Sequence, residues 1–155
     1  MGAEEKVAEL GLELPPPPQA MGIYRPIVIV GNLAHISGHG PLKADGSFLT
    51  GRVGQDTDLA GGVAAARQTG LAILATLRDQ LKTLDRVRRV VKVFGMVNST
   101  ADFEDHPAVI NGASELFRDV FGETAGVGAR SAVGMGSLPG NITTEIEAIL
   151  EVEVP

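Results

Sequence analysis

The chain has no cysteine and few aromatic residues. Without Cys among its 155 residues, disulfide bonds, thiolate metal sites and a cysteine nucleophile are all excluded. Aromatic residues make up 4% of the chain, with five Phe, one Tyr and no Trp, so few rings are present on which nucleobases could stack. The stability of the fold must therefore come from the packing of aliphatic side chains.

Basic residues and long apolar runs are also scarce. Thirteen Lys and Arg against 19 Asp and Glu give a formal net charge of −6, which disfavours binding to phosphate backbones. No apolar run approaches the ~18 residues that a membrane span needs. The segment AEEK at residues 3–6 has neither the basic nor the apolar region of a signal peptide. We therefore expect a cytoplasmic protein that binds neither nucleic acid nor membranes.

The length of the chain and its 44% content of hydrophobic residues suit one domain with a sizeable core. We predict an N-terminal arm over residues 1–19 and a single domain over residues 20–155. In the arm, residues 3–11 suit a short helix ended by Gly11, and the four prolines that follow must run extended. A helix this short contributes little unless it docks, so deletion of residues 1–14 is expected to leave folding and activity nearly unchanged.

The domain is predicted to be α+β. Residues 27–30 and 33–38 flank a Gly-Asn pair, a two-residue loop typical of β-hairpins. Apolar residues recur at helical spacing over residues 56–84, residues 87–97 suit a central strand, and residues 107–121 suit a second helix. This order favours a mixed sheet with two helices packed on one face. The other face would expose apolar area to water, and oligomerisation would cover it.

The last strands are predicted to form an antiparallel hairpin, in which residues 130–139 and 144–149 pair across a turn. Opposed residues in such a hairpin share a face. One predicted face is a core made of Ser131, Val133, Met135, Ile142, Ile146, Ala148, Leu150 and Val152. The other predicted face carries Arg130, Ala132, Gly134, Thr143, Glu145 and Glu147. The hairpin therefore predicts that Arg130 and Glu145 lie on the same face.

Over about residues 20–154 these motifs resemble the RidA/YjgF family of imine and enamine deaminases, also catalogued as endoribonuclease L-PSP. The most specific motifs are Ala129-Arg130-Ser131, Leu138-Pro139 and EIEAI at residues 145–149. Weaker motifs occur in the right order, and they are Tyr24, Gly31-Asn32, SGHGP at residues 37–41, Asp102-Phe103 and Asn111.

The resemblance implies a chorismate-mutase-like fold assembled as a homotrimeric barrel, with three active sites in the clefts between subunits. It implies that Arg130 binds the substrate carboxylate and that Glu145 positions or activates the hydrolytic water. The other residues expected to bind substrate are Tyr24, Ser37, Gly38, His39, Met96, Ser131 and Ala132. The expected reaction is hydrolysis of 2-imino or 2-enamino acids to 2-keto acids and ammonia.

The residue types suit this chemistry. An arginine binds a carboxylate through two parallel charge-assisted hydrogen bonds, which fix the orientation of the substrate. Glu145 could accept a proton from water if desolvation or Glu147 raises its pKa. No metal or cofactor is required. His35 and His39 share the strand parity of Ser37 but lie too far apart to chelate one metal ion readily.

Several residues leave alternatives open. Taken alone, a strand arginine that faces a glutamate is more often a structural ion pair, and Glu147 is interpreted as structural. The family often has cysteine at the position of Ala132 and glutamine at that of His39, and about four residues near 104–107 are inserted here. A non-catalytic trimer that binds a small carboxylate or acts as a regulatory protein is therefore the alternative function. Ribonuclease activity is least favoured, because the chain is acidic and shows no evident pair of catalytic histidines.

Overall fold

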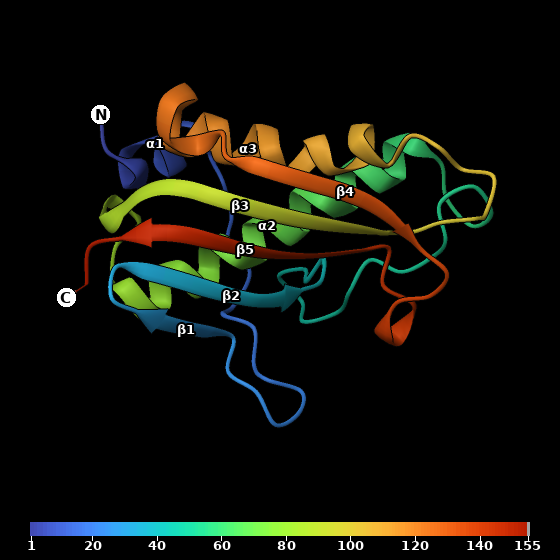
Figure 1. The fold of residues 1–155 in the computed structure, drawn as a ribbon, viewed down its shortest axis with the longest axis horizontal. Helices are drawn as coiled ribbons and strands as arrows, with labels where there is room; N and C mark the ends of the chain where they lie inside the picture. Colours follow the sequence, from blue (N-terminus) through green and yellow to red (C-terminus); the bar gives the residue numbers. More distant parts are fainter. Residues whose placement is uncertain (155) are drawn as a thin grey trace.

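The computed structural model describes residues 1–154 as a five-stranded mixed sheet with helices packed on one side (Figure 1). The α-helices are α1 (Ala3–Glu9), α2 (Leu59–Leu81) and α3 (His106–Gly126). The strands are β1 (Ile27–Val30), β2 (Leu33–His39), β3 (Val87–Asn98), β4 (Ala129–Met135) and β5 (Thr144–Val152). Two short 3₁₀ helices are η1 (Leu84–Arg86) and η2 (Pro139–Asn141). The predicted α+β class, mixed sheet and pair of long helices are confirmed.

The strands lie in the order β1-β2-β5-β3-β4, and β3–β4 is the parallel pair. Both long helices cover the same face of the sheet, which lies behind the strands in Figure 1. Helix α2 begins at Asp58, whose side chain accepts a hydrogen bond from the backbone N–H of Gly61. Lys82 ends it in the left-handed conformation, and α3 is broken at Gly122, close to its predicted end.

The core fills the space between the helices and the sheet. Alternate residues of β5 face the helices and are buried, namely Ile146, Ala148, Leu150 and Val152. A Cβ at Gly95 would lie 2.6 Å from the Ile110 side chain, so only glycine lets α3 pack this closely on β3. We call the uncovered side of the sheet its open face. None of the helices within residues 1–154 is long and apolar enough to cross a membrane.

The predicted C-terminal hairpin is wrong. Strand β4 pairs in parallel with β3 at the sheet edge, whereas β5 lies between β2 and β3 and is antiparallel to both. The physical reason is the connection: α3 joins β3 to β4, and a helical crossover brings the second strand back parallel to the first. Residues 136–143 then carry the chain past the end of β3 into the middle of the sheet.

This topology changes which residues share a face. Arg130 pairs with the buried Val93, so its side chain projects from the helix-covered face. Ser131 and Val133 pair with Phe94 and Met96 and project from the open face, not into the predicted core. The predicted core is therefore correct for β5 and wrong for β4.

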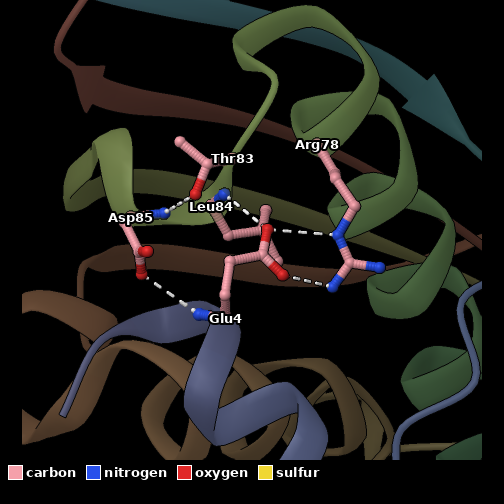
Figure 2. Close-up of polar contacts among 5 residues, drawn as sticks. All are labelled: Glu4, Arg78, Thr83, Leu84 and Asp85. Carbon is pink, nitrogen blue, oxygen red and sulfur yellow. Dashed lines mark hydrogen bonds and ion pairs between the residues drawn. The ribbon is translucent and has the colours of Figure 1, made fainter.

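The N-terminal helix α1 is docked on the domain. Val7 is buried, and α1 contacts α3 and η1. The Glu4 carboxylate accepts hydrogen bonds from Arg78 at 3.2 and 2.7 Å and from the Leu84 N–H at 2.8 Å. In return, Asp85 accepts a hydrogen bond from the Glu4 N–H at 3.1 Å (Figure 2). These contacts give α1 a role in stability that its length alone did not predict.

Candidate functional site

A cavity of about 810 Å³ opens where β2 and β5 meet the N-terminal arm, which in the structure extends beyond residue 19 to Pro26, just before β1. Its walls come from four parts of the chain: the arm, the end of β2, the turn that follows β2, and the segment from η2 into β5. The lining includes five of the predicted site residues, namely Tyr24, Ser37, Gly38, His39 and Glu145. Sequence motifs more than 100 positions apart therefore meet in one place.

Glu145 is the acidic group of this cavity with the most perturbed environment. It lies on the open face of β5, half-buried and paired across the sheet with Met96. Burial raises the pKa of Glu145, and the nearby negative charge of Glu147 raises it further. A carboxylate of raised pKa is a better proton acceptor near neutral pH than an ordinary surface glutamate. Glu145 is therefore suited to act as a general base.

Gly38 allows the carboxylate to take this position. A Cβ at Gly38 would lie 2.5 Å from Oε2 of Glu145, so any larger residue would push the glutamate away from β2. Gly38 therefore contributes to the site by leaving room for the Glu145 carboxylate. Met96 lies beside Glu145 in the sheet but is absent from the cavity lining among the described residues.

Ser37 and Tyr24 line the cavity and also hold the arm in place. The Ser37 hydroxyl donates to the carbonyl of Arg25 at 2.5 Å, and its N–H donates to the carbonyl of Pro26 at 3.0 Å. The Tyr24 hydroxyl oxygen accepts a hydrogen bond from the Met21 N–H at 3.1 Å. The Ser37 hydroxyl therefore already uses its proton in a hydrogen bond to the arm. The Tyr24 hydroxyl only accepts, so it can still donate a hydrogen bond to a ligand.

His39 belongs to the lining of the cavity, but it is buried and its ring reaches Thr76 on α2. A β-bulge between Ile36 and His39 breaks the alternation of the strand, so the parity that predicted His39 beside Ser37 is wrong here. The residue is 4% exposed, and its ring lies between the sheet and α2. Its Nδ1 contacts the Ser37 carbonyl at 2.6 Å and its Nε2 contacts the Thr76 hydroxyl at 2.7 Å.

These partners define the protonation state of His39. A carbonyl can only accept, so Nδ1 carries the proton, and Nε2 accepts from the Thr76 hydroxyl. Burial lowers the pKa of His39, against the smaller opposing effect of its hydrogen bond to Ser37. The ring is therefore neutral near pH 7, and it acts as a structural support beneath Ser37 and Gly38. Thr76 lies in the middle of an apolar helix, and no sequence signal pointed to it.

Arg130 does not line the cavity beside Glu145 and lies instead next to α3. Its Nη1 donates to Oδ1 of Asn111 at 2.7 Å and to the Ser114 hydroxyl at 3.1 Å, both on α3. It lines a second cavity of about 340 Å³ together with Arg118 and Glu123. Within residues 1–154 Arg130 forms no ion pair, so its partners are neutral and its charge remains available to an anion.

The neighbours of Arg130 on β4 also lie away from Glu145. The Ser131 hydroxyl accepts from Nζ of Lys92 at 3.3 Å on the open face, and Ala132 packs against the core. The prediction that Arg130 and Glu145 share one face of one chain is therefore wrong, because β4 pairs with β3 rather than with β5. Among residues 1–154, His, Asp and Glu side chains form no group of three that could bind a metal ion.

Comparisons with known proteins place the chain among relatives of similar length. The sequence profile of the family described as "YjgF/chorismate_mutase-like, putative endoribonuclease" matches residues 4–145. The chain is 38% identical to Protein TCP17 of Trypanosoma cruzi over 143 residues, which are 92% of this chain and 89% of that protein. It is 29% identical to the 2-iminobutanoate/2-iminopropanoate deaminase of Dermatophagoides farinae, over 92% of this chain and 95% of that protein.

Solved structures show the same fold. A protein of unknown function from Agrobacterium tumefaciens is 42% identical with a TM-score of 0.88, over 97% of this chain and 94% of that one. A putative endoribonuclease from Shewanella oneidensis is 30% identical with a TM-score of 0.93, over 98% and 100%. RidA from an Antarctic Psychrobacter is 29% identical with a TM-score of 0.60, over 88% and 94%.

Proposed function

We propose, since the chain belongs to the YjgF/chorismate mutase-like family, that it is a deaminase of 2-imino and 2-enamino acids. The observation that carries this proposal is Glu145, a half-buried carboxylate of raised pKa at the wall of a cavity that also contains Ser37 and Tyr24. The similarity to a mite imine deaminase over nearly the whole chain supports the same reaction.

The site we propose is shared between two copies of the chain. Arg130 and Glu145 project from opposite faces of one sheet, so a single substrate can reach both only if each comes from a different copy. We propose a homotrimer in which the open faces turn inward as a barrel. Two features support it: the open face carries the exposed Val28 and Val30, and Arg130 lies on the edge strand β4.

In the proposed reaction, Arg130 holds the carboxylate of the imino acid through its guanidinium fork. The imine reacts in its protonated form: water attacks the C=N carbon while Glu145 accepts one of its protons, giving a neutral tetrahedral amino alcohol. The protonated glutamate then transfers this proton to the nitrogen. As the C–N bond breaks, Glu145 accepts the hydroxyl proton and passes it to the departing ammonia, so the 2-keto acid and ammonium leave and the carboxylate is restored. Imines also hydrolyse in water alone, so positioning can supply much of the acceleration.

The experiment that tests this function follows imine loss against the spontaneous rate. An amino-acid oxidase generates the 2-imino acid, and purified protein is expected to increase its hydrolysis. Arg130→Lys keeps the charge but loses the two-pronged geometry, so kcat/KM should fall on the order of a hundredfold. Arg88→Lys, at an exposed ion pair with Glu153, is the matched control and should change nothing.

The alternative function is binding of a small carboxylate without turnover. The neutral partners of Arg130 favour it, because they hold a charged group ready for an anion without requiring any chemistry. Binding of 2-ketobutyrate that depends on Arg130, with no acceleration on several imino acids, would support this alternative and reject the deaminase.

A further inference from the structure

We infer that the substrate carries a large apolar side chain, of the size found in leucine, methionine or phenylalanine, and that the N-terminal arm selects it. This inference rests on the proposed function. The cavity beside Glu145 has a volume of about 810 Å³. This volume belongs to the isolated chain, and a second copy would cover part of it in the proposed trimer. Cavities of about 300–1,000 Å³ hold drug-sized ligands, so a cavity reduced in this way still has room for a side chain larger than one or two carbons.

The cavity has a polar wall and an apolar wall, and this difference would orient a substrate. Ser37, Gly38 and Glu145 form the polar part, where the imine carbon would react. The remaining wall is mainly apolar and includes Pro18, Met21, Pro26, Phe48, Pro139 and Ile142. Met21 is 82% exposed in the isolated chain, which leaves its apolar surface free to contact a ligand.

The charge of the lining disfavours acidic side chains. Glu145 and Glu147 are the charged groups of the lining, and among residues 1–154 no Lys or Arg contributes to it. A substrate with an acidic side chain would place like charges together in a partly dehydrated space. The cavity therefore disfavours acidic side chains and favours apolar ones.

The apolar wall from the arm is held in place before any substrate binds. Ser37 fixes the arm on its β1 side through the carbonyls of Arg25 and Pro26. Tyr24 tightens the loop through the Met21 N–H, and the Glu4 cluster of Figure 2 anchors the preceding helix α1. A wall fixed in advance loses little entropy when a substrate binds, which strengthens selectivity.

The test compares imino acids made in place from alanine, leucine, methionine and phenylalanine. We expect kcat/KM to be at least tenfold higher for the three larger substrates than for the alanine imine. Met21→Ala should reduce this ratio severalfold. Ile23→Ala is the matched control, because Ile23 is fully exposed on the same loop but does not line the cavity, and its ratio should equal that of the wild type.

Each outcome decides the inference. A kcat/KM advantage of less than tenfold over the alanine imine, a ratio unchanged in Met21→Ala, or equal or faster hydrolysis of imines with basic side chains overturns the inference and leaves the proposed deaminase standing. If no imine is hydrolysed, the proposed function fails, and calorimetric titration of the full-length protein with 2-keto acids decides. Tighter binding of phenylpyruvate or 4-methyl-2-oxopentanoate than of pyruvate then supports the apolar pocket, and equal binding rejects it.

Discussion

Arg130 and Glu145 project from opposite faces of the same β-sheet. Arg130 pairs with Val93 and Glu145 pairs with Met96, and these two partners lie an odd number of positions apart on β3. No rotamer change brings the two groups together across the sheet. If both act on one substrate, the active site must combine two copies of the chain, and this requirement can be tested directly.

Two inactive variants should restore activity when they assemble together. Arg130→Ala and Glu145→Gln are each expected to lose nearly all deaminase activity, because each removes one half of every site. In randomly mixed trimers, about one quarter of the clefts combine an intact arginine from one copy with an intact glutamate from the other. Coexpression should therefore return about a quarter of the wild-type activity.

Assembly itself is the control for this mixing experiment. Analytical ultracentrifugation of the wild type and of both variants should give three times the 16.1 kDa chain mass. A monomer at micromolar concentration would reject the shared site. Mixed trimers of the right mass that stay inactive would show that the two residues do not act in one cleft.

The proposed deaminase activity should depend on the protonation of Glu145. The base must be deprotonated, so kcat/KM should rise with pH through the pKa of Glu145, which lies above its ordinary value of 4.5. Glu147→Gln removes a neighbouring negative charge, so it should shift this rise to lower pH. Glu145→Gln should lower kcat and abolish the rise, and an unchanged pH profile in that variant would identify a different base.

The stability of the fold should decrease in mild acid because of His39. Burial lowers its pKa below the ordinary 6.5, so the unfolded chain binds this proton more readily than the folded one. The stabilising contribution is complete above pH 6.5 and is lost progressively below it. Denaturant unfolding between pH 8 and 5 should show a steeper loss for the wild type than for His39→Gln, and parallel curves would argue against this role.

Glu4 should stabilise the protein although it lies in a short helix near the start of the chain. Glu4→Ala removes the acceptor of two Arg78 bonds and of the Leu84 N–H, so we expect a loss on the order of 1–2 kcal/mol in the free energy of unfolding. Glu9→Ala, which breaks an exposed pair with Lys6 on the same helix, should cost less than about 0.5 kcal/mol. Equal losses in denaturant titrations would show that α1 is not specifically anchored.

Sequence patterns predicted the local elements of this fold well. The Gly-Asn turn, the helical spacing of α2 and the β-branched run of β3 each depend on neighbouring residues, and such signals can be read from one sequence. The pairing of β4 could not be read in this way. The alternation of side chains along β4 is compatible with pairing to either β3 or β5. The packing of α3 on the sheet decides that β4 pairs in parallel with β3.

The candidate site was predicted in part for the same reason. Tyr24, Ser37, Gly38 and Glu145 line one cavity, and their roles in binding and catalysis stay predictions. The orientation of His39 was not predicted, because a β-bulge moves every residue beyond it to the other face of the strand. Such a bulge cannot be recognised from the amino-acid composition of the strand. The apolar wall of the cavity was not predicted either. Its residues lie in loops, and the paths of these loops depend on the complete fold.

The hydrogen bonds of Glu4 also determine when the N-terminal helix α1 can dock on the rest of the molecule during folding. Glu4 and the Leu84 amide are separated by 80 positions, so their bond forms only after α2 and η1 exist to present its partners. Closing so long a loop is entropically costly, and α1 offsets this cost through its contacts with α3 and η1, which must also be in place. We expect α1 to be the last helix to dock during folding and the first to detach, with the Leu84 amide exchanging its hydrogen faster than the amides of β5.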